Sequence, residues 1–222
     1  MDAPGWKAPI SYTTDQESER ARMIAEQIRD RGVADPRVLA AMAAVPRHAF
    51  LEPALAGLAY ADRPLPLGFG QTISQPYIVA FMAEALGLRG GERVLEVGSG
   101  CGYMAAVLAR LAGSVHGIEL EAALVARACR TLAALGGPPV TLRCGDGRFG
   151  WPEAAPFDAI LASCAAEAIP AAWWDQLAPA GRILLPLERS GRQDLVLARR
   201  GPEGPRYLAL LPVAFVPLRA PA

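Results

Sequence analysis

Three glycines at alternate positions, between a short apolar run and a helical pattern, give the first sign of chemistry in this chain. The stretch reads V-L-E-V-G-S-G-C-G-Y and contains Gly98, Gly100 and Gly102. Glycine tolerates the sharp turn that a strand-to-helix junction needs, and its missing Cβ lets a ligand approach the main chain. Carboxylates lie on both sides: Glu96 precedes the turn, and Glu119 ends the next predicted strand.

The two carboxylates indicate which ligand such a turn would bind. Glu119 is placed where a ribose diol is held in a dinucleotide-binding unit, but Tyr103 stands where the fingerprint G-x-G-x-x-G needs its last glycine. Glu96 has the wrong charge for a pyrophosphate and the right one for an ammonium group. The predicted ligand is therefore S-adenosylmethionine, an adenosine that carries an amino acid. The pattern E-x-G-x-G-x-G resembles motif I of the Rossmann-like methyltransferases.

Composition and charge bound the other possibilities. The chain has 222 residues, 52% of them hydrophobic, and its formal net charge is zero. This length predicts one domain with appendages, and the balanced charge gives no indication of a nucleic-acid partner. The cysteines form no C-x-x-C pair, and with two histidines no metal site is predicted. The four cysteines are Cys101, Cys129, Cys144 and Cys164.

The sequence also bears on where the protein works. No basic segment precedes an apolar run at the N-terminus, and no stretch reaches the roughly 18 apolar residues of a membrane span. We therefore expect a cytoplasmic monomer with reduced thiols and no membrane partner.

The first ninety residues predict helices and a long irregular loop. Residues 1–14 are rich in proline and small polar residues, which indicates a flexible arm. Residues 50–70 contain several prolines and are expected to be mostly irregular, and a loop of this length in a compact domain is usually functional or disordered. The expected elements are a helix from about Asp15 to Arg31, a helix from Pro36 (capped by Asp35) to Ala44, a short strand Gln71–Ile73, and a helix through Leu86 with Ser74 as its cap and Pro76 in its first turn.

Strands and helices alternate over the rest of the chain, which predicts a parallel, doubly wound sheet. The expected strands are Val94–Val97, Ser114–Glu119, Val140–Cys144, Phe157–Ala162 and Arg182–Leu187, and the expected helices are Tyr103–Leu111, Ala122–Leu135 and Ile169–Leu177. Two further strands, near Asp194–Arg199 and Tyr207–Phe215, have hairpin-like spacing and predict an antiparallel edge.

These elements define the predicted fold class. It is α/β, a Rossmann-like doubly wound and mostly parallel sheet with an antiparallel C-terminal edge and an N-terminal helical extension. The arm is expected at residues 1–14, the N-terminal helices and the substrate and active-site loop at 15–90, and the methyltransferase core at 91–222, all within one compact domain.

Several segments resemble one methyltransferase family. R-P-L-P-L-G-F-G-Q-T-I-S-Q-P-Y-I-V-A-F-M (residues 63–82) is very similar to the signature segment of the protein-L-isoaspartate O-methyltransferases. The stretches D-P-R-V-L-A-A-M-A-A-V-P-R-H-A-F, V-L-E-V-G-S-G-C-G-Y, C-G-D-G, A-P-F-D-A-I and F-V-P-L match the same family in the same order. The resemblance covers roughly residues 17–219, and Q-T-I-S-Q-P is far more specific to the family than the glycine turn.

The resemblance implies an enzyme that methylates the α-carboxyl of L-isoaspartyl residues in damaged proteins and peptides, which starts their repair through a succinimide. Ser74 would be the active-site serine, and Asp146 and Gly147 would lie beside the adenine. The residues expected at the cofactor are Thr72, Ile73, Glu96, Gly98, Ser99, Gly100, Gly102, Glu119, Leu120, Asp146 and Gly147. Those expected at the substrate are Ser74, Cys164, Ala165, Val216 and Pro217.

The expected chemistry needs little from the protein beyond alignment. The methyl donor is a sulfonium and the acceptor carboxylate is ionised at neutral pH, so neither a metal nor a strong general base is required. Ser74 suits the role of a hydrogen-bond donor that orients the acceptor.

The chain departs from the family in the run after the fourth strand, where Cys164 replaces the usual alanine and Glu167 the usual proline. Glu167 would weaken the binding of an anion if it pointed inward. Methylation of another carboxylate, such as an aspartate of a specific peptide, is the alternative that this run supports. A cofactor-binding module without catalysis is the other.

Overall fold

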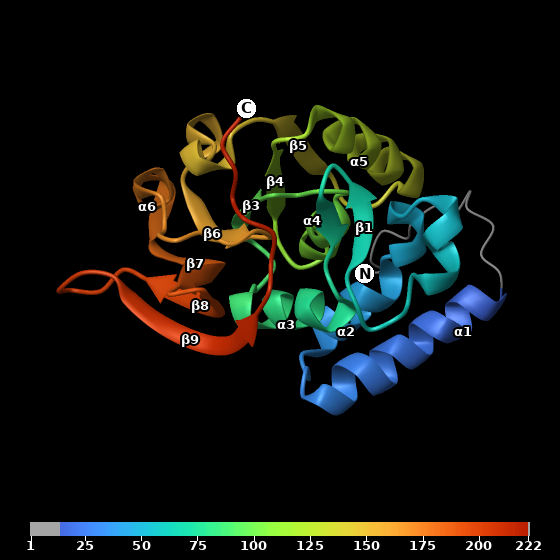
Figure 1. Ribbon diagram of the computed structural model, residues 1–222. Coiled ribbons are helices and arrows are strands. Elements are labelled where there is room, and N and C mark those ends of the chain that lie inside the picture. Colours follow the sequence, from blue (N-terminus) through green and yellow to red (C-terminus); the bar gives the residue numbers. More distant parts are fainter. Residues whose placement is uncertain (1–13, 222) are drawn as a thin grey trace.

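The computed structural model describes residues 14–221, and within them seven strands form one sheet in the order β5-β4-β3-β6-β7-β8-β9 (Figure 1). The strands are β3 (Arg93–Val97), β4 (Ser114–Glu119), β5 (Val140–Cys144), β6 (Phe157–Ala162), β7 (Leu177–Arg189), β8 (Arg192–Arg199) and β9 (Arg206–Val213). Neighbours from β5 to β7 are parallel, and β8 and β9 add antiparallel hairpins at one side. The predicted doubly wound sheet with an antiparallel C-terminal edge is confirmed.

Side chains alternate across the sheet and feed two apolar clusters, one on each face. Val94 packs with the N-terminal helices and with α3 (Pro76–Leu86), α4 (Tyr103–Leu108) and α5 (Ala122–Leu135). Leu95 and Val97 belong to the opposite cluster, which includes Trp173 of α6 (Ala171–Gln176). Glu96 therefore occurs on the same face of β3 as Val94, below the glycine turn.

The N-terminal extension is helical, as predicted. The helical elements are α1 (Thr14–Arg22), a π-helix (Met23–Ile28), a 3₁₀ turn (Arg29–Arg31), α2 (Pro36–Ala44), and the 3₁₀ helices Arg47–Phe50 and Pro53–Leu58. Asp35 caps α2, because its side chain accepts a hydrogen bond from the amide of Arg37. The predicted arm lies outside the described residues except for Thr14, the first residue of α1.

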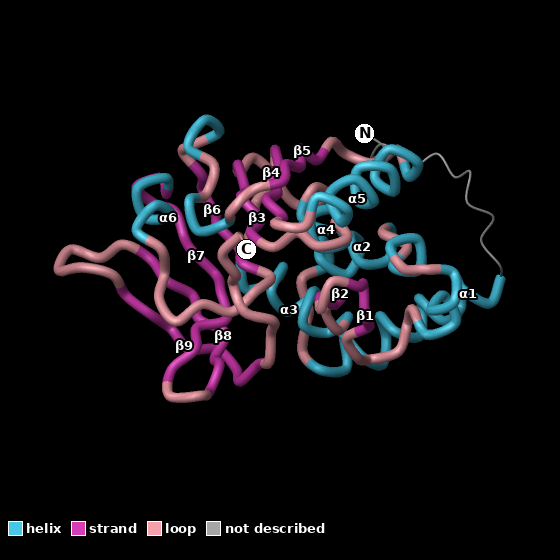
Figure 2. The backbone as a smooth tube through the Cα atoms, turned by 45° about the horizontal axis from the view of Figure 1, so that its top comes forward, coloured by secondary structure: helices cyan, strands magenta, loops and turns pink. Residues whose placement is uncertain are grey.

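Residues 50–70 are more ordered than expected. Besides the 3₁₀ helices they contain β1 (Leu65–Gly68), which pairs antiparallel with β2 (Gln71–Ile73). This hairpin stands apart from the large sheet (Figure 2). Its tight connection uses Gly68, Phe69 and Gly70, all with positive φ, which the two glycines adopt without strain.

Some element boundaries differ from prediction. α6 was predicted from Ile169 but begins at Ala171, after Pro170. The residue before a proline avoids helical geometry, so Ile169 does not start the helix. β7 then starts at Leu177, directly after α6. α4 ends at Leu108, before the predicted Leu111, and the residues up to Leu111 form turns with hydrogen bonds between residues three apart. Ser74 does not cap α3: Gln75 is the residue before the helix, and no side chain caps it.

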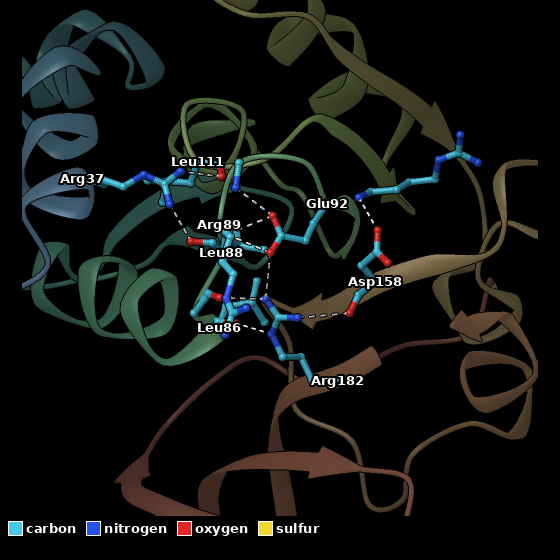
Figure 3. A network of polar contacts seen from close by, with 11 residues as sticks. Arg37, Leu86, Leu88, Arg89, Glu92, Leu111, Asp158 and Arg182 are labelled. Atoms are coloured by element: carbon cyan, nitrogen blue, oxygen red, sulfur yellow. Dashed lines mark hydrogen bonds and ion pairs between the residues drawn. The ribbon is translucent and has the colours of Figure 1, made fainter. Parts of the chain in front are cut away.

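Arginines hold the edge of the sheet opposite to the glycine turn (Figure 3). Arg182 of β7 donates to the carbonyl oxygens of Leu86 and Gly87 at the end of α3, and lies 3.5 Å from Glu92. Glu92 in turn accepts from the amides of Arg89 and Gly90. This network fixes the junction between α3 and β3.

We expect Arg182→Met to lower the free energy of unfolding by about 2 kcal/mol, because charge-assisted hydrogen bonds to a half-buried guanidinium are lost. Urea denaturation measures the change. Arg130→Met on the exposed side of α5 is the control and should stay within about 0.5 kcal/mol of wild type. Equal stability of the two variants would contradict the structural role of Arg182.

Candidate active site

The glycine turn lies where β3, β4 and β6 end, the edge at which open α/β sheets bind ligands. Gly98, Gly100 and Gly102 have φ of 77°, 53° and 85°. The amides of Gly98 and Ser99 both donate to the carbonyl of Ile118, which ties the turn to β4. A Cβ on Gly98 would lie 3.2 Å from Cys164 Sγ, and one on Gly102 would lie 3.2 Å from the Ala128 side chain. Gly98 thus faces the cavity and Gly102 allows close packing of α5.

Glu119 is held rigidly at the end of β4. It is 7% exposed, its Oε2 accepts from the amide of Gly100 at 2.8 Å, and its Oε1 accepts from the amide of Glu121 at 3.0 Å. A carboxylate oxygen accepts more than one hydrogen bond, so both oxygens retain capacity for a ribose diol. Glu119 lines two adjoining cavities, with Leu120 in one of them.

Glu96 is fully buried and incompletely satisfied. Its Oε1 accepts from Ser163 Oγ at 3.0 Å, whereas Oε2 lacks a partner among residues 14–221. Burial raises the pKa of Glu96 to about 8, against hydrogen bonds from Ser163 and Ser99 that favour the ionised form. The carboxyl is therefore mostly neutral at pH 7, and an adjacent ammonium group would favour its ionisation.

These features fit the predicted ligand. The unpartnered oxygen of Glu96 suits an ammonium group, and Glu119 suits a pair of hydroxyls. Gly98 and Gly100 line the same cavity as the two carboxylates, and neither adds a side chain to it. The two carboxyl groups thus match the ammonium and hydroxyl groups of an adenosine linked to an amino acid.

The raised pKa of Glu96 makes stability depend on pH. The folded protein keeps this proton at pH values where the unfolded chain, with an ordinary value near 4.5, has released it. Unfolding therefore becomes easier between about pH 5 and pH 8, and Glu96→Gln should remove that dependence. We expect wild type to lose about 3 kcal/mol relative to Glu96→Gln over this range. Urea denaturation of both proteins at four pH values measures it, and parallel curves would exclude a raised pKa.

Asp146, which the resemblance placed beside the adenine, is engaged by a neighbouring arginine. That carboxylate is paired with the guanidinium of Arg148 at 2.5 Å and caps the following turn by accepting from the Arg148 amide. Asp146 lines none of the cavities at the glycine turn, whereas Gly147 does. A Cβ on Gly147 would meet Val97 Cγ1 at 2.4 Å, so glycine is required there for packing.

Ser74 lies between two cavities, in the connection from β2 to α3. One holds Glu96, Glu119 and the glycine turn, and Thr72 and Ile73 share its wall. The other, of about 440 Å³, extends toward β9 and also includes Thr72. Among residues 14–221 the structure shows no hydrogen bond to the Ser74 hydroxyl, so this group is available to a ligand.

The C-terminal tail crosses the carboxyl edge of the sheet (Figure 1). Gln193 accepts from the amide of Phe215 at 2.7 Å and donates to its carbonyl at 3.2 Å. Ala165 brackets Pro217 by donating to Val216 O and accepting from the amide of Leu218. Val216 lines both cavities beside Ser74, and Pro217 lines the neighbouring cavity that contains Leu120 and Gly147. The backbone of Ala165 thus holds the C-terminal tail in place against the site.

The unusual run after β6 has a mixed placement. Cys164 is buried against the glycine turn and burial raises its pKa to about 12, so the thiol stays protonated. Glu167 is exposed and lines none of the cavities that include Ser74. The sequence left the direction of the Glu167 side chain open, and the structure places it away from the cavities beside Ser74.

Some residues at the site were not singled out from the sequence. Ser163 lines both cavities and bonds Glu96. Its position directly after a buried parallel strand was the available signal, because such strand ends meet at the ligand-binding edge. The other cavity-lining residues that were not predicted at the site are Pro64, Leu67, Gln71, Gln75, Ile78, Val79, Val97, Cys101, Tyr103, Met104, Ile118, Pro212, Val213, Ala214, Phe215 and Arg219.

The sheet order, the glycine turn and the carboxylate that ends β4 together define the Rossmann-like class of S-adenosylmethionine-dependent methyltransferases. The family model of Protein-L-isoaspartate(D-aspartate) O-methyltransferase (PCMT) matches residues 18–221. The chain therefore belongs to the protein-L-isoaspartate O-methyltransferase family.

Relatives with that name match nearly end to end. Protein-L-isoaspartate O-methyltransferase 2 of Anaeromyxobacter sp. (strain Fw109-5) is 58% identical over 212 residues, 95% of this chain and 87% of that protein. The Methylorubrum extorquens (strain PA1) protein is 56% identical over 218 residues, 97% of this chain and 95% of that protein.

Solved structures agree on the fold. A protein-L-isoaspartate O-methyltransferase has a TM-score of 0.81 at 30% identity, covering 90% of this chain and 66% of that chain. A Plasmodium falciparum structure in complex with S-adenosyl-L-homocysteine has a TM-score of 0.78 at 24% identity, covering 92% of this chain and 98% of that chain. At that identity it supports the fold alone.

Proposed function

We propose that this chain methylates the α-carboxylate of L-isoaspartyl residues in damaged proteins, with S-adenosylmethionine as methyl donor, and so starts their repair through a succinimide. The observation that carries the proposal is the position of the Ser74 hydroxyl. It lies in the wall common to a cavity with two carboxylates for a cationic nucleoside and a larger cavity for the acceptor.

The larger cavity suits a peptide carboxylate. Its walls are Pro64, Thr72, Ser74, Gln75, Ile78, Ser163 and the run from Pro212 to Val216. None of these side chains is ionisable, so no carboxylate there repels the acceptor. The walls are mostly apolar, which favours the removal of water from the reacting groups.

The residues of this chain have limited tasks in the reaction. S-adenosylmethionine supplies, when bound, an electrophilic methyl group on a sulfonium. Glu119 would bind its ribose hydroxyls and Glu96 its ammonium group. Ser74 would donate a hydrogen bond to the acceptor carboxylate and orient it. No side chain has to remove a proton, because that carboxyl group, with a pKa near 4, is ionised at neutral pH.

The decisive assay offers one peptide in two forms, isoaspartyl and aspartyl, with a labelled methyl donor. We expect base-labile methyl ester on the isoaspartyl form. Ester on the aspartyl form alone would instead indicate a different carboxyl methyltransferase, and cofactor binding without ester would indicate a regulatory module.

The remaining proposals concern setting and partners. None of the helices in residues 14–221 is long and apolar enough to cross a membrane, and the cysteines there are free thiols. The free thiols support a reducing compartment such as the cytoplasm, and the zero net charge supports proteins and peptides as partners in place of nucleic acid. That the protein acts as a monomer is proposed from the sequence alone.

A further inference from the structure

Arg47 is a buried cation directly behind the active-site serine. It is 0% exposed and begins the 3₁₀ helix Arg47–Phe50. Its Nη1 donates to the carbonyl of Ala59, and its Nη2 donates to the carbonyls of Arg63 at 3.2 Å and Ser74 at 3.0 Å. One guanidinium therefore gathers three backbone groups of the loop that carries Ser74 into the site.

In the part of the chain that the structure describes, the Arg47 guanidinium has no carboxylate partner at ion-pair distance. Among residues 14–221, no ion pair within 4.0 Å includes Arg47, and its Nε has no acceptor. The carboxylate of Asp62 favours protonated Arg47 from beyond ion-pair distance, and it is at the same time paired with Arg31 at 2.7 Å. Burial lowers the pKa of Arg47, yet a guanidinium stays protonated at neutral pH. Burying a cation without a counter-ion is costly.

Arg182 is a second arginine of this chain that donates to backbone carbonyl oxygens, and it has a structural role. Its guanidinium also binds carbonyl oxygens, those of Leu86 and Gly87, but Glu92 lies 3.5 Å away as a counter-ion. Arg182 is at the opposite edge of the sheet from the glycine turn. Both arginines thus donate to backbone carbonyl oxygens. Within the described part of the chain, only Arg182 has a carboxylate within 4.0 Å, and only Arg47 contacts the residue beside the acceptor cavity, Ser74.

We infer that Arg47 is a positioning residue for methyl transfer. It fixes the Ser74 backbone, and its charge, which no carboxylate of residues 14–221 pairs within 4.0 Å, favours a carboxylate over a neutral group in the cavity beside Ser74. The inference rests on the proposed function, which supplies the anionic acceptor. The substrate would then provide the missing negative charge near Arg47.

The Ser74 peptide group is the route by which Arg47 acts. Its carbonyl accepts from Arg47, and the amide at its other end belongs to Gln75, which lines the same cavity as Ser74. A hydrogen bond from a cation to one end of a peptide group polarises it and strengthens the donor at the other end. In an interior of low dielectric, a fixed cation also acts over a longer distance than in water.

The test compares Arg47→Met and Arg47→Lys with Arg182→Met as the matched control. Two peptides are used: one with L-isoaspartate, as substrate, and one with its neutral α-carboxamide analogue, as inhibitor. The readouts are kcat/KM for the first, the inhibition constant of the second, the dissociation constant of S-adenosylhomocysteine, and the melting temperature. Affinity for S-adenosylhomocysteine should stay within about threefold in all variants, because Arg47 lines none of the cavities that hold Glu96 and Glu119.

We expect Arg47→Met to lower kcat/KM for the isoaspartyl peptide by about 10- to 100-fold while the inhibition constant of the carboxamide changes little. Arg47→Lys keeps the charge but loses the planar guanidinium that reaches three carbonyl oxygens. It should therefore retain the preference for the carboxylate at a lower kcat. Arg182→Met should lower the melting temperature and leave both peptide constants within about threefold.

Contrary results separate the two claims. If wild type does not esterify the isoaspartyl peptide, the proposed function fails. If wild type does so but Arg47→Met loses affinity for both peptides equally, or behaves like Arg182→Met, the role of Arg47 fails alone. Should Arg47→Met not fold, Arg47→Lys decides: loss of the preference for the carboxylate despite the retained charge overturns the inference.

Discussion

Glu119→Ala is expected to raise the dissociation constant of S-adenosylhomocysteine by about 100- to 1,000-fold. A hydrogen bond to a charged group is worth about 1.5–3 kcal/mol. A ribose diol would make two such bonds to this carboxylate, and because they share one acceptor group their contributions are expected to add only in part. The amides of Gly100 and Glu121 would also lose their acceptor, which loosens the turn that must meet the ligand. Titration calorimetry measures the change directly.

A matched control distinguishes ligand binding from loss of a backbone anchor. Glu84 also accepts hydrogen bonds from two amides, those of Ala34 and Asp35 at 2.7 Å each, but between α2 and α3. Glu84→Ala should lower stability and leave the dissociation constant within about twofold. Glu119→Gln keeps one acceptor oxygen and should lie between the two. Unchanged affinity in Glu119→Ala would remove this residue from the cofactor site.

Ser74→Ala is expected to lower kcat for an isoaspartyl peptide by about 10- to 150-fold, at about 1.4 kcal/mol per decade for a charge-assisted hydrogen bond. The hydroxyl neither caps α3 nor binds another residue among 14–221, so its removal should leave the melting temperature within about 2 °C. Cofactor affinity should be nearly unchanged. Initial rates with saturating methyl donor measure the effect.

The control for a serine-to-alanine change is Ser114→Ala. Ser114 begins β4 and pairs with Arg93 at the start of β3, at the end of the strands away from the glycine turn. It should retain wild-type kcat. Turnover by Ser74→Ala equal to that of Ser114→Ala would end the proposed role of Ser74.

Local sequence patterns were sufficient for most elements. β4, α5, β5 and β6 have the predicted bounds, because alternation or helical periodicity, together with glycine stops, acts over a few residues. The glycine turn and its two carboxylates were also found this way, since strand ends in a parallel sheet meet at one edge. The predicted end of α4, both predicted bounds of α6 and the predicted start of β7 were wrong, because tertiary contacts decide them.

The sequence by itself determined the fold class, the family and the residue types at the site. Tertiary structure alone decided how those residues are coupled. Glu96 lies in β3 whereas Ser163 follows β6, and Arg47 begins a 3₁₀ helix whereas Ser74 lies between β2 and α3. The tail around Val216 returns from the far edge of the sheet. Burial then set the protonation of Glu96, and a neighbour two residues away engaged Asp146. The physical reason is range: hydrogen-bond periodicity is local, whereas desolvation and charge pairing depend on which distant surfaces come together.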